Sequence, residues 1–525
     1  MHQVRVDGLQ EAYMKMCRSF LWIFLSVFFV FTPITYASSE DFNKLWFSGS
    51  IEEAFAKAKS DKKPMLLYWG AVWCPPCNVL KSQIFNRPEF QAITEPVLRV
   101  YLDGDTAAAQ KWGDTLHASG YPTLLLLSSD GSELFRISNS VNWDEFKETW
   151  EAALAAHGSF ADALESAQKT DASRSVWRLL AYTHWYPEDI VPSKRAELLA
   201  LREKLIAKIP SEYIAEKALL ISGLLDEVSS LEDESDASVF SLSGNAVQYM
   251  NFLLGTQEAV WSSRDFLVFN SRSVLPWLKK RSESKEFADL CLRWIRAAEF
   301  IRTRKLTSPD QRLGSLLPSL YISREFSQNK KSTLAEIKRA VVEAAKYADS
   351  EAKSSFERHS IISSAAYMLQ EVGEREASRR LLLKELKQTD TPWYYQSSLA
   401  SLEEKEGDKK QALVWSHLAK ESAKGNATRL QWITNDLLLN LRLAPQNAFA
   451  VNKLLREYYD LAFSLPDGFK GRNARRARSV RDALKKVAKK EALQETLEFY
   501  KERCKQNSME KPETCKKIFA FSSKT

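Results

Sequence analysis

The chain has 525 residues, of which 45% are apolar and 27% are charged, a balance typical of a folded protein with several domains that excludes wholesale disorder. Its 17 glycines and 17 prolines are few for this length, which argues against a mostly β, collagen-like or low-complexity chain and favours long helices. The formal charge of +7 comes from 74 basic and 67 acidic side chains, mixed along most of the sequence, so we expect no nucleic-acid partner.

The first 37 residues have the pattern of a secretory signal. Lys15 and Arg18 precede an apolar run at residues 20–31, and small residues lead to Ala37, after which we place the cleavage site. The alternative is an uncleaved membrane anchor, but the apolar run is shorter than the roughly 20 residues that cross a bilayer as a helix. The sequence therefore predicts a signal peptide at 1–37 and export to the periplasm, where disulfides persist.

Strands and helices alternate in residues 38–157. Short apolar runs bounded by turn residues predict buried strands at 65–69, 97–102, 123–127 and 133–137. Apolar residues at helical spacing predict helices at 51–60, from 75 past 81, at 106–117 and at 141–156. This order predicts an α/β domain in which a βαβ unit is followed by a β-hairpin and a closing helix.

The motif that carries chemistry is Trp73-Cys74-Pro75-Pro76-Cys77, at the passage from the first strand into a helix. Cys74 would begin this helix, where the helix dipole and unpaired backbone N–H groups favour the thiolate and lower the pKa of the thiol. Cys77, one turn further along, would be less exposed and suited to resolving a mixed disulfide.

Two other interpretations of this cysteine pair are a zinc site and an inert structural disulfide. Zinc usually takes four ligands, whereas the sequence has no second cysteine pair at this spacing and only six scattered histidines. We therefore predict a redox-active dithiol and expect neither a metal nor a cofactor.

The cysteine motif and the later segment Gly120-Tyr121-Pro122-Thr123 resemble, in order and spacing, the active-site and cis-proline motifs of the thioredoxin superfamily. The resemblance covers residues 41–156. Lys63-Pro64 and the helix before it are most similar to the C-terminal domain of DsbD-type thiol:disulfide interchange proteins.

This resemblance implies a thioredoxin-like fold and a role for each motif residue. Cys74 would be the attacking thiol and Cys77 the resolving one, and Pro122 would be cis in a loop that pairs with the substrate backbone. A substrate-binding role is implied for the residues around the dithiol, namely Trp73, Tyr121, Pro122 and Thr123.

One position departs from the family pattern. Many thioredoxins have a buried acid six positions before the first cysteine, which helps to deprotonate the resolving thiol, and this chain has Tyr68 there. A tyrosine is a poor base near neutral pH because its pKa is about 10.

The remaining residues predict an all-α region, which we divide into a helical part at 158–235 and a helical-repeat part at 236–525. One internal period is visible, because Ser363, Ser364, Ala366 and Gly373 recur 34 residues later as Ser397, Ser398, Ala400 and Gly407. The spacing is similar to that of tetratricopeptide (TPR) repeats. The alternative is a generic array of helical hairpins in which the match is coincidental.

Three segments interrupt the helical pattern or change its charge. We expect an exposed acidic loop at 226–236 and a break at 308–318, which contains Pro and Gly. Residues 470–490 hold ten basic side chains and one acid. This stretch is either a solvated helical face or a patch for an acidic partner or a membrane surface.

Three cysteines lie beyond the signal and the dithiol. Cys504 and Cys515 are the obvious pair for a structural disulfide in an oxidising compartment, although two free thiols or a second redox pair are alternatives. Cys291 lies in an apolar helical pattern and is expected to be a small buried residue.

The sequence therefore favours an exported thiol-disulfide oxidoreductase, in the reductase direction, fused to a helical region that binds a client or another protein partner. Disulfide-containing proteins would be its clients, and a membrane electron donor would re-reduce the dithiol. An oxidase or isomerase would use the same atoms at a different reduction potential. The alternative is a non-enzymatic exported scaffold whose thioredoxin-like domain only docks proteins.

Overall fold

A computed structural model of the chain describes residues 39–118, 120–138, 141–156, 158–169, 171–185, 192–230, 245–305, 307–326, 330–465, 468–487, 491–506 and 512–520. The predicted signal peptide lies outside these residues. The described residues from Phe42 onward form one compact unit, and the sheet and all helices from α3 (Ile51–Asp61) onward belong to it. None of the described helices is both long and apolar enough to cross a membrane.

The N-terminal domain is built on a four-stranded mixed sheet in the order β2-β1-β3-β4. Strand β1 (Met65–Gly70) is parallel to β2 (Leu98–Asp103) and antiparallel to β3 (Thr123–Leu127), which pairs antiparallel with β4 (Glu133–Ile137). The predicted βαβ unit and β-hairpin are thereby confirmed. The helical elements of this part are α2 (Ser39–Lys44), α3, α4 (Pro75–Leu80), the π-helix η1 (Lys81–Phe85), α5 (Pro88–Thr94), α6 (Ala107–Thr115) and α7 (Trp143–Ala155).

Strand β1 is central and buried on both faces, which explains why its sequence is continuously apolar. Its side chains alternate between two apolar clusters. Leu66 and Tyr68 pack in the cluster that continues into α4 and α7, whereas Leu67 and Trp69 pack in the cluster that includes α3. The strand is therefore held firmly, and its carboxyl end presents the cysteine motif at a fixed place.

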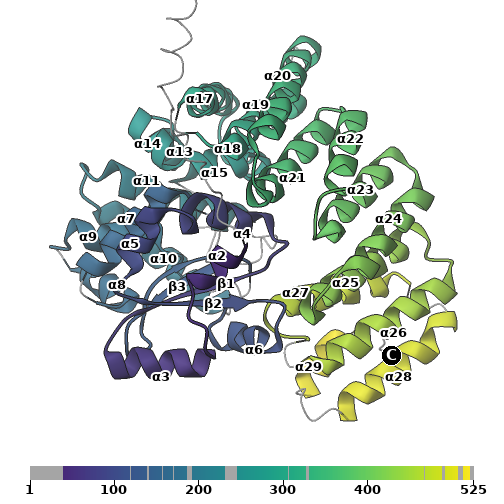
Figure 1. Ribbon diagram of the computed structural model, residues 1–525. Coiled ribbons are helices and arrows are strands. Elements are labelled where there is room, and N and C mark those ends of the chain that lie inside the picture. The colour runs from purple at the N-terminus through teal and green to yellow at the C-terminus, as the bar shows by residue number, and fades with distance from the viewer. Residues whose placement is uncertain are drawn as a thin grey trace, which may run out of the picture. The chain divides into compact units, whose positions relative to one another are not determined.

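The rest of the described chain is mainly helical (Figure 1). In the part after the sheet, the helices are α8 (Phe160–Gln168), α9 (Arg174–Tyr182), α10 (Pro192–Lys208), α11 (Ile214–Ser230), α13 (Ala246–Leu253), α14 (Gln257–Ser262), α15 (Arg264–Phe269), α16 (Ser271–Lys279), α17 (Ser284–Thr303), α18 (Pro309–Gly314) and α19 (Leu316–Phe326). The later helices are α20 (Lys330–Glu351), α21 (Ser355–Glu371), α22 (Arg375–Glu385), α23 (Pro392–Glu406), α24 (Lys409–Ser422), α25 (Asn426–Leu443), α26 (Ala448–Ser464), α27 (Gly471–Lys485), α28 (Glu491–Gln506) and α29 (Pro512–Ile518). From α20 to α26 each helix packs on the next, as the green to yellow part of Figure 1 shows.

The 34-residue period corresponds to two successive helical hairpins, α21 with α22 and α23 with α24. Gly373 and Gly407 follow the first helix of each hairpin and have φ angles of 79° and 87°, in the left-handed region that glycine adopts at helix ends. The repeated glycine thus marks equivalent turns, and the arrangement is consistent with TPR-like repeats.

The structure contradicts part of each of two expected interruptions. Helix α11 continues to Ser230 through the first part of the acidic segment, because Leu224, Leu225 and Val228 keep an apolar face in the core; residues 231–236 lie outside the described part of the chain. At 308–318 the chain forms α18 and the start of α19. Ser308 caps α18, whose first residue is a proline, and a proline is tolerated there because the first helical N–H has no partner within the helix.

At the C-terminal end, Cys504 of α28 and Cys515 of α29 form a disulfide within an apolar cluster that also contains helices α25 to α27. Cys291 of α17 is buried.

Candidate active site

Cys74 and Cys77 lie at the beginning of α4, directly after the central strand. Cys74 is the N-cap residue, and its Sγ accepts a hydrogen bond from the backbone N–H of Cys77 at 3.4 Å. The two prolines between them occupy the first helical turn, where their missing N–H groups cost little. Cys77 is fully buried, and its Sγ accepts a hydrogen bond from the backbone N–H of Ala71 at 3.5 Å.

The loop before β3 brings a second motif to the dithiol. The Tyr121–Pro122 peptide bond is cis, and the Cys74 thiol donates to the carbonyl of Tyr121 at 3.6 Å. The Tyr121 ring packs against Trp69 at 4.3 Å and Trp73 at 6.0 Å between ring centroids. The Thr123 hydroxyl donates a hydrogen bond to the carbonyl of Gly120 at 2.8 Å.

The structure therefore brings Trp73, Cys74, Cys77, Tyr121 and Pro122 together. Thr123 is buried at the start of β3, where it pairs with Trp69 and does not face the dithiol's open side. A substrate-contacting role for its side chain has no geometric support here.

Helix α25, more than 300 residues further along the chain, covers the cysteine motif. Trp73 Nε1 donates to Thr428 Oγ1 at 2.6 Å and also lies 3.2 Å from Asp105 Oδ2. The Asp105 carboxylate accepts hydrogen bonds from the backbone N–H of Thr428, at 3.0 Å, and from its hydroxyl. Trp432 continues this contact, with its ring 6.3 Å from that of Trp73. Beside this contact, Cys74 is only 4% exposed.

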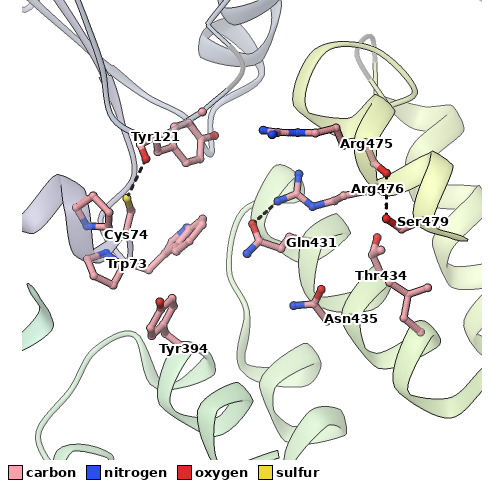
Figure 2. A pocket seen from close by; sticks show the side chains of 14 residues that line it. Trp73, Cys74, Tyr121, Tyr394, Gln431, Thr434, Asn435, Arg475, Arg476 and Ser479 are labelled. Atoms are coloured by element: carbon pink, nitrogen blue, oxygen red, sulfur yellow. Dashed lines mark hydrogen bonds between the residues drawn. The ribbon is translucent and has the colours of Figure 1, made fainter. Parts of the chain in front are cut away.

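A cavity of about 440 Å³ lies between the dithiol and the helical region (Figure 2). On the side of the N-terminal domain it is lined by Trp73, Cys74, Pro75, Pro76, Gly120 and Tyr121. The opposite wall comes from α23, α25 and α27, and consists of Tyr394, Gln431, Thr434, Asn435, Leu438, Arg475, Arg476 and Ser479. Sequence reasoning missed this wall, because helical periodicity does not show which distant helix packs on the motif.

Comparison with known proteins agrees with this geometry. Residues 46–129 match the family model of thioredoxin-like proteins. A stretch of 125 residues is 27% identical to the thiol:disulfide interchange protein DsbD 2 of Pseudomonas aeruginosa. This stretch covers 23% of this chain and 21% of that protein. The N-terminal domain is thioredoxin-like. The chain spans only about a fifth of the length of that relative.

Burial changes the electrostatics of the thioredoxin-like dithiol. Burial raises the pKa of the Cys74 thiol well above its usual range, and the neighbouring Cys77 raises it further. For Cys77 burial also opposes the thiolate, but hydrogen bonds from Cys74 and the Ala71 N–H, together with the charge of Lys81, outweigh it and lower the pKa. The Cys77 backbone N–H at the helix end acts in the expected direction and lowers the pKa of Cys74, but in this covered arrangement the loss of water outweighs it.

Lys81 is a further charged group of the site that sequence reasoning missed. It lies four residues after Cys77, one helical turn on, and is 2% exposed. Its Nζ lies 5.1 Å from the ring centroid of Phe42 and 5.4 Å from that of Phe356 on α21. Burial lowers the pKa of Lys81, although the thiols oppose this shift. Burial also raises the pKa of Tyr68 well above its usual range, so Tyr68 stays protonated and Lys81 is the nearby charge that stabilises a thiolate.

Among the described residues, no group of three or more His, Cys, Asp or Glu side chains is arranged to hold a metal ion.

Proposed function

We propose that this protein is an exported thiol-disulfide oxidoreductase that reduces disulfides in client proteins with Cys74 and Cys77. The observation that carries the proposal is the position of the Cys74 sulfur, which contacts both the Cys77 backbone and the cis-proline loop. Cys74 Sγ lies 3.4 Å from the Cys77 nitrogen and 3.6 Å from the Tyr121 carbonyl oxygen. The family match and the partial similarity to a thiol:disulfide interchange protein support the same chemistry.

In the reducing direction, Cys74 first gives up its proton, and its thiolate attacks one sulfur of the client disulfide. A bond forms between Cys74 and the client, the client's own S–S bond breaks, and its second sulfur leaves as a thiolate that takes up a proton. The Cys77 thiolate then attacks the sulfur of Cys74, so the internal disulfide forms and the first client sulfur leaves and is protonated. The client gains two electrons and two protons, and a membrane-bound dithiol donor restores the reduced pair.

The helical region would bind the client or another protein partner, because it supplies the wall opposite the dithiol. Export would follow from the signal-like segment at residues 1–37. The same atoms would serve an oxidase or isomerase if the reduction potential were high.

The first test replaces each cysteine in the full chain. Cys74→Ser is expected to abolish reduction of a model protein disulfide with dithiothreitol as electron source, because no sulfur remains to attack. Cys77→Ser is expected to accumulate a mixed disulfide that non-reducing electrophoresis detects. Cys291→Ser is the matched control, since Cys291 is a buried cysteine of α17, and is expected to keep full activity.

The reduction potential of the pair decides the direction. Equilibration with thiol redox buffers, followed by tryptophan fluorescence, is expected to give a value near that of thioredoxin, about −270 mV. A value near that of a strong periplasmic oxidant, about −120 mV, would reverse the proposed direction.

A second candidate function, a docking scaffold without redox chemistry, is favoured by one observation. Cys74 is 4% exposed, and α25 covers its neighbour Trp73. The scaffold predicts that client binding is the same in Cys74→Ser as in the unaltered protein, and that neither protein reduces a disulfide.

A further inference from the structure

Charge is distributed unevenly around the cavity. Among the described residues that line it, the charged side chains are Arg475 and Arg476 of α27, and none is acidic. Figure 2 shows both arginines extending from α27 toward the space in front of Tyr121 and Cys74. The wall opposite the dithiol therefore presents positive charge to whatever reaches the sulfur.

Arg476 is held in place by neighbours on the same wall. Its Nη2 donates to Gln431 Oε1 at 2.6 Å, and its Nη1 donates to Asn473 Oδ1 at 3.3 Å. Both acceptors are neutral amide oxygens, and these contacts orient the guanidinium. A planar guanidinium held in this way is suited to carboxylate recognition.

The size of the cavity limits what can enter. A volume of about 440 Å³ is within the usual range for clefts that hold small ligands or short chain segments, and is too small for a folded domain. In an extended segment successive residues advance by about 3.3 Å, so side chains a few positions from a half-cystine would reach across the cavity.

We propose that this cavity selects client segments in which the half-cystine is flanked by acidic residues, with Arg475 and Arg476 binding the client carboxylates. This inference rests on the proposed function and names the substrate class of the same site. The basic stretch at 470–490 thereby acquires a role in specificity beyond that of a solvated face.

The test compares three disulfide-linked peptides that differ only in the residues flanking the half-cystine, which are Glu, Gln or Lys. With the full chain, kcat/KM for reduction at low salt is expected to be about tenfold higher for the Glu peptide than for the Lys peptide, because two arginines attract the first and repel the second. The preference is expected to shrink at high salt. In Arg475→Gln/Arg476→Gln the ratio is expected to fall to about twofold or less.

Arg478→Gln/Arg481→Gln is the matched control. It removes the same charge from the same helix, but these two residues line a different cavity, so the tenfold ratio is expected to remain. Loss of the ratio in this control would show a general effect of net charge and would overturn the assignment to Arg475 and Arg476.

A neutral small disulfide separates failure of this inference from failure of the proposed function. If the unaltered protein reduces neither that compound nor any peptide, the oxidoreductase proposal fails. If it reduces the neutral compound but treats the Glu and Lys peptides alike, only the acidic preference is refuted. If a small dicarboxylate disulfide reacts with the same arginine dependence while the peptides show no preference, the substrate is a small molecule and the peptide assignment is wrong.

Discussion

Replacing Thr428 by valine tests whether α25 controls access to Cys74. The substitution keeps the shape of the buried side chain but removes the hydroxyl, which accepts a hydrogen bond from Trp73 and donates one to Asp105. A neutral hydrogen bond contributes about 1 kcal/mol and one to a charged group about 1.5–3 kcal/mol, so the two bonds together contribute about 2.5–4 kcal/mol. The remaining bond from the Thr428 backbone N–H to Asp105 keeps the loss near the lower end of this sum, at about 2–3 kcal/mol.

This loss predicts how much faster Cys74 of the variant reacts with iodoacetamide than Cys74 of the unaltered protein. If the thiol reacts only when the cover opens, each 1.4 kcal/mol raises the open population tenfold, and Thr428→Val should speed alkylation about 30- to 140-fold. Peptide mass spectrometry of samples quenched over time measures the rate at Cys74, with buried Cys291 as an internal reference. Thermal unfolding of the variant verifies that the fold is retained.

Thr434→Val is the matched control for this experiment. Thr434 lies on the same helix and lines the same cavity, but its hydroxyl donates to the carbonyl of Leu430 within α25 at 2.7 Å. Its alkylation rate is expected to equal that of the unaltered protein. Equal rates for all three proteins would refute the argument that the Trp73–Thr428–Asp105 contact keeps Cys74 from reagents.

Three further outcomes follow from single interactions. Lys81→Met should raise the pKa of Cys77, because a nearby positive charge that favours the thiolate is lost. Thiolate absorbance near 240 nm as a function of pH measures this pKa, and an unchanged titration would contradict the role given to Lys81. Replacing both Cys504 and Cys515 by alanine opens a loop with a sequence separation of 11. Denaturant unfolding should then show that the free energy of unfolding falls by about 2.8 kcal/mol, as the chain-entropy relation gives. An unchanged free energy of unfolding would mean that the loop is as ordered without the disulfide. Burial raises the pKa of Asp310 to about 6. Between about pH 4 and 6 the folded protein therefore keeps a proton on Asp310 that the unfolded chain has released, and the free energy of unfolding falls as the pH rises through this window. Asp310→Asn should therefore raise the melting temperature at pH 8 and have little effect at pH 4, and equal effects at both pH values would contradict the assignment.

Much of the thioredoxin-like domain could be predicted from the sequence, because its signals are local. The strands at 123–127 and 133–137 have the predicted bounds, β1 ends one residue later than predicted, and β2 is shifted by one residue at both ends. Apolar runs bounded by turn residues specify strands through burial alone, and the cysteine motif follows its strand directly. The helix after Cys77 is less regular than predicted, since it passes into a π-helix at Lys81.

The other half of the site could not be predicted, because it depends on pairing between distant segments. The signal at Thr428 is weak, since a threonine in the first turn of a helix is ordinary, and nothing local connects it to Trp73. The basic stretch was visible, but its charge alone does not show that Arg475 and Arg476 face the dithiol whereas Arg478 and Arg481 do not.

The cover over Cys74 and the charged wall have a common support in α25. Thr428 and Gln431 are three residues apart, so they lie on one face of the helix, where the first bonds Trp73 and the second orients Arg476. Thr428→Val should therefore do more than expose the Cys74 sulfur. It should also displace Gln431 and weaken the preference for acidic client segments, so that Thr428→Val gains alkylation rate while its Glu-to-Lys ratio falls. If the ratio stayed at about tenfold while alkylation rose, the wall would be held by α27 alone, and access and specificity would be independent properties of the site.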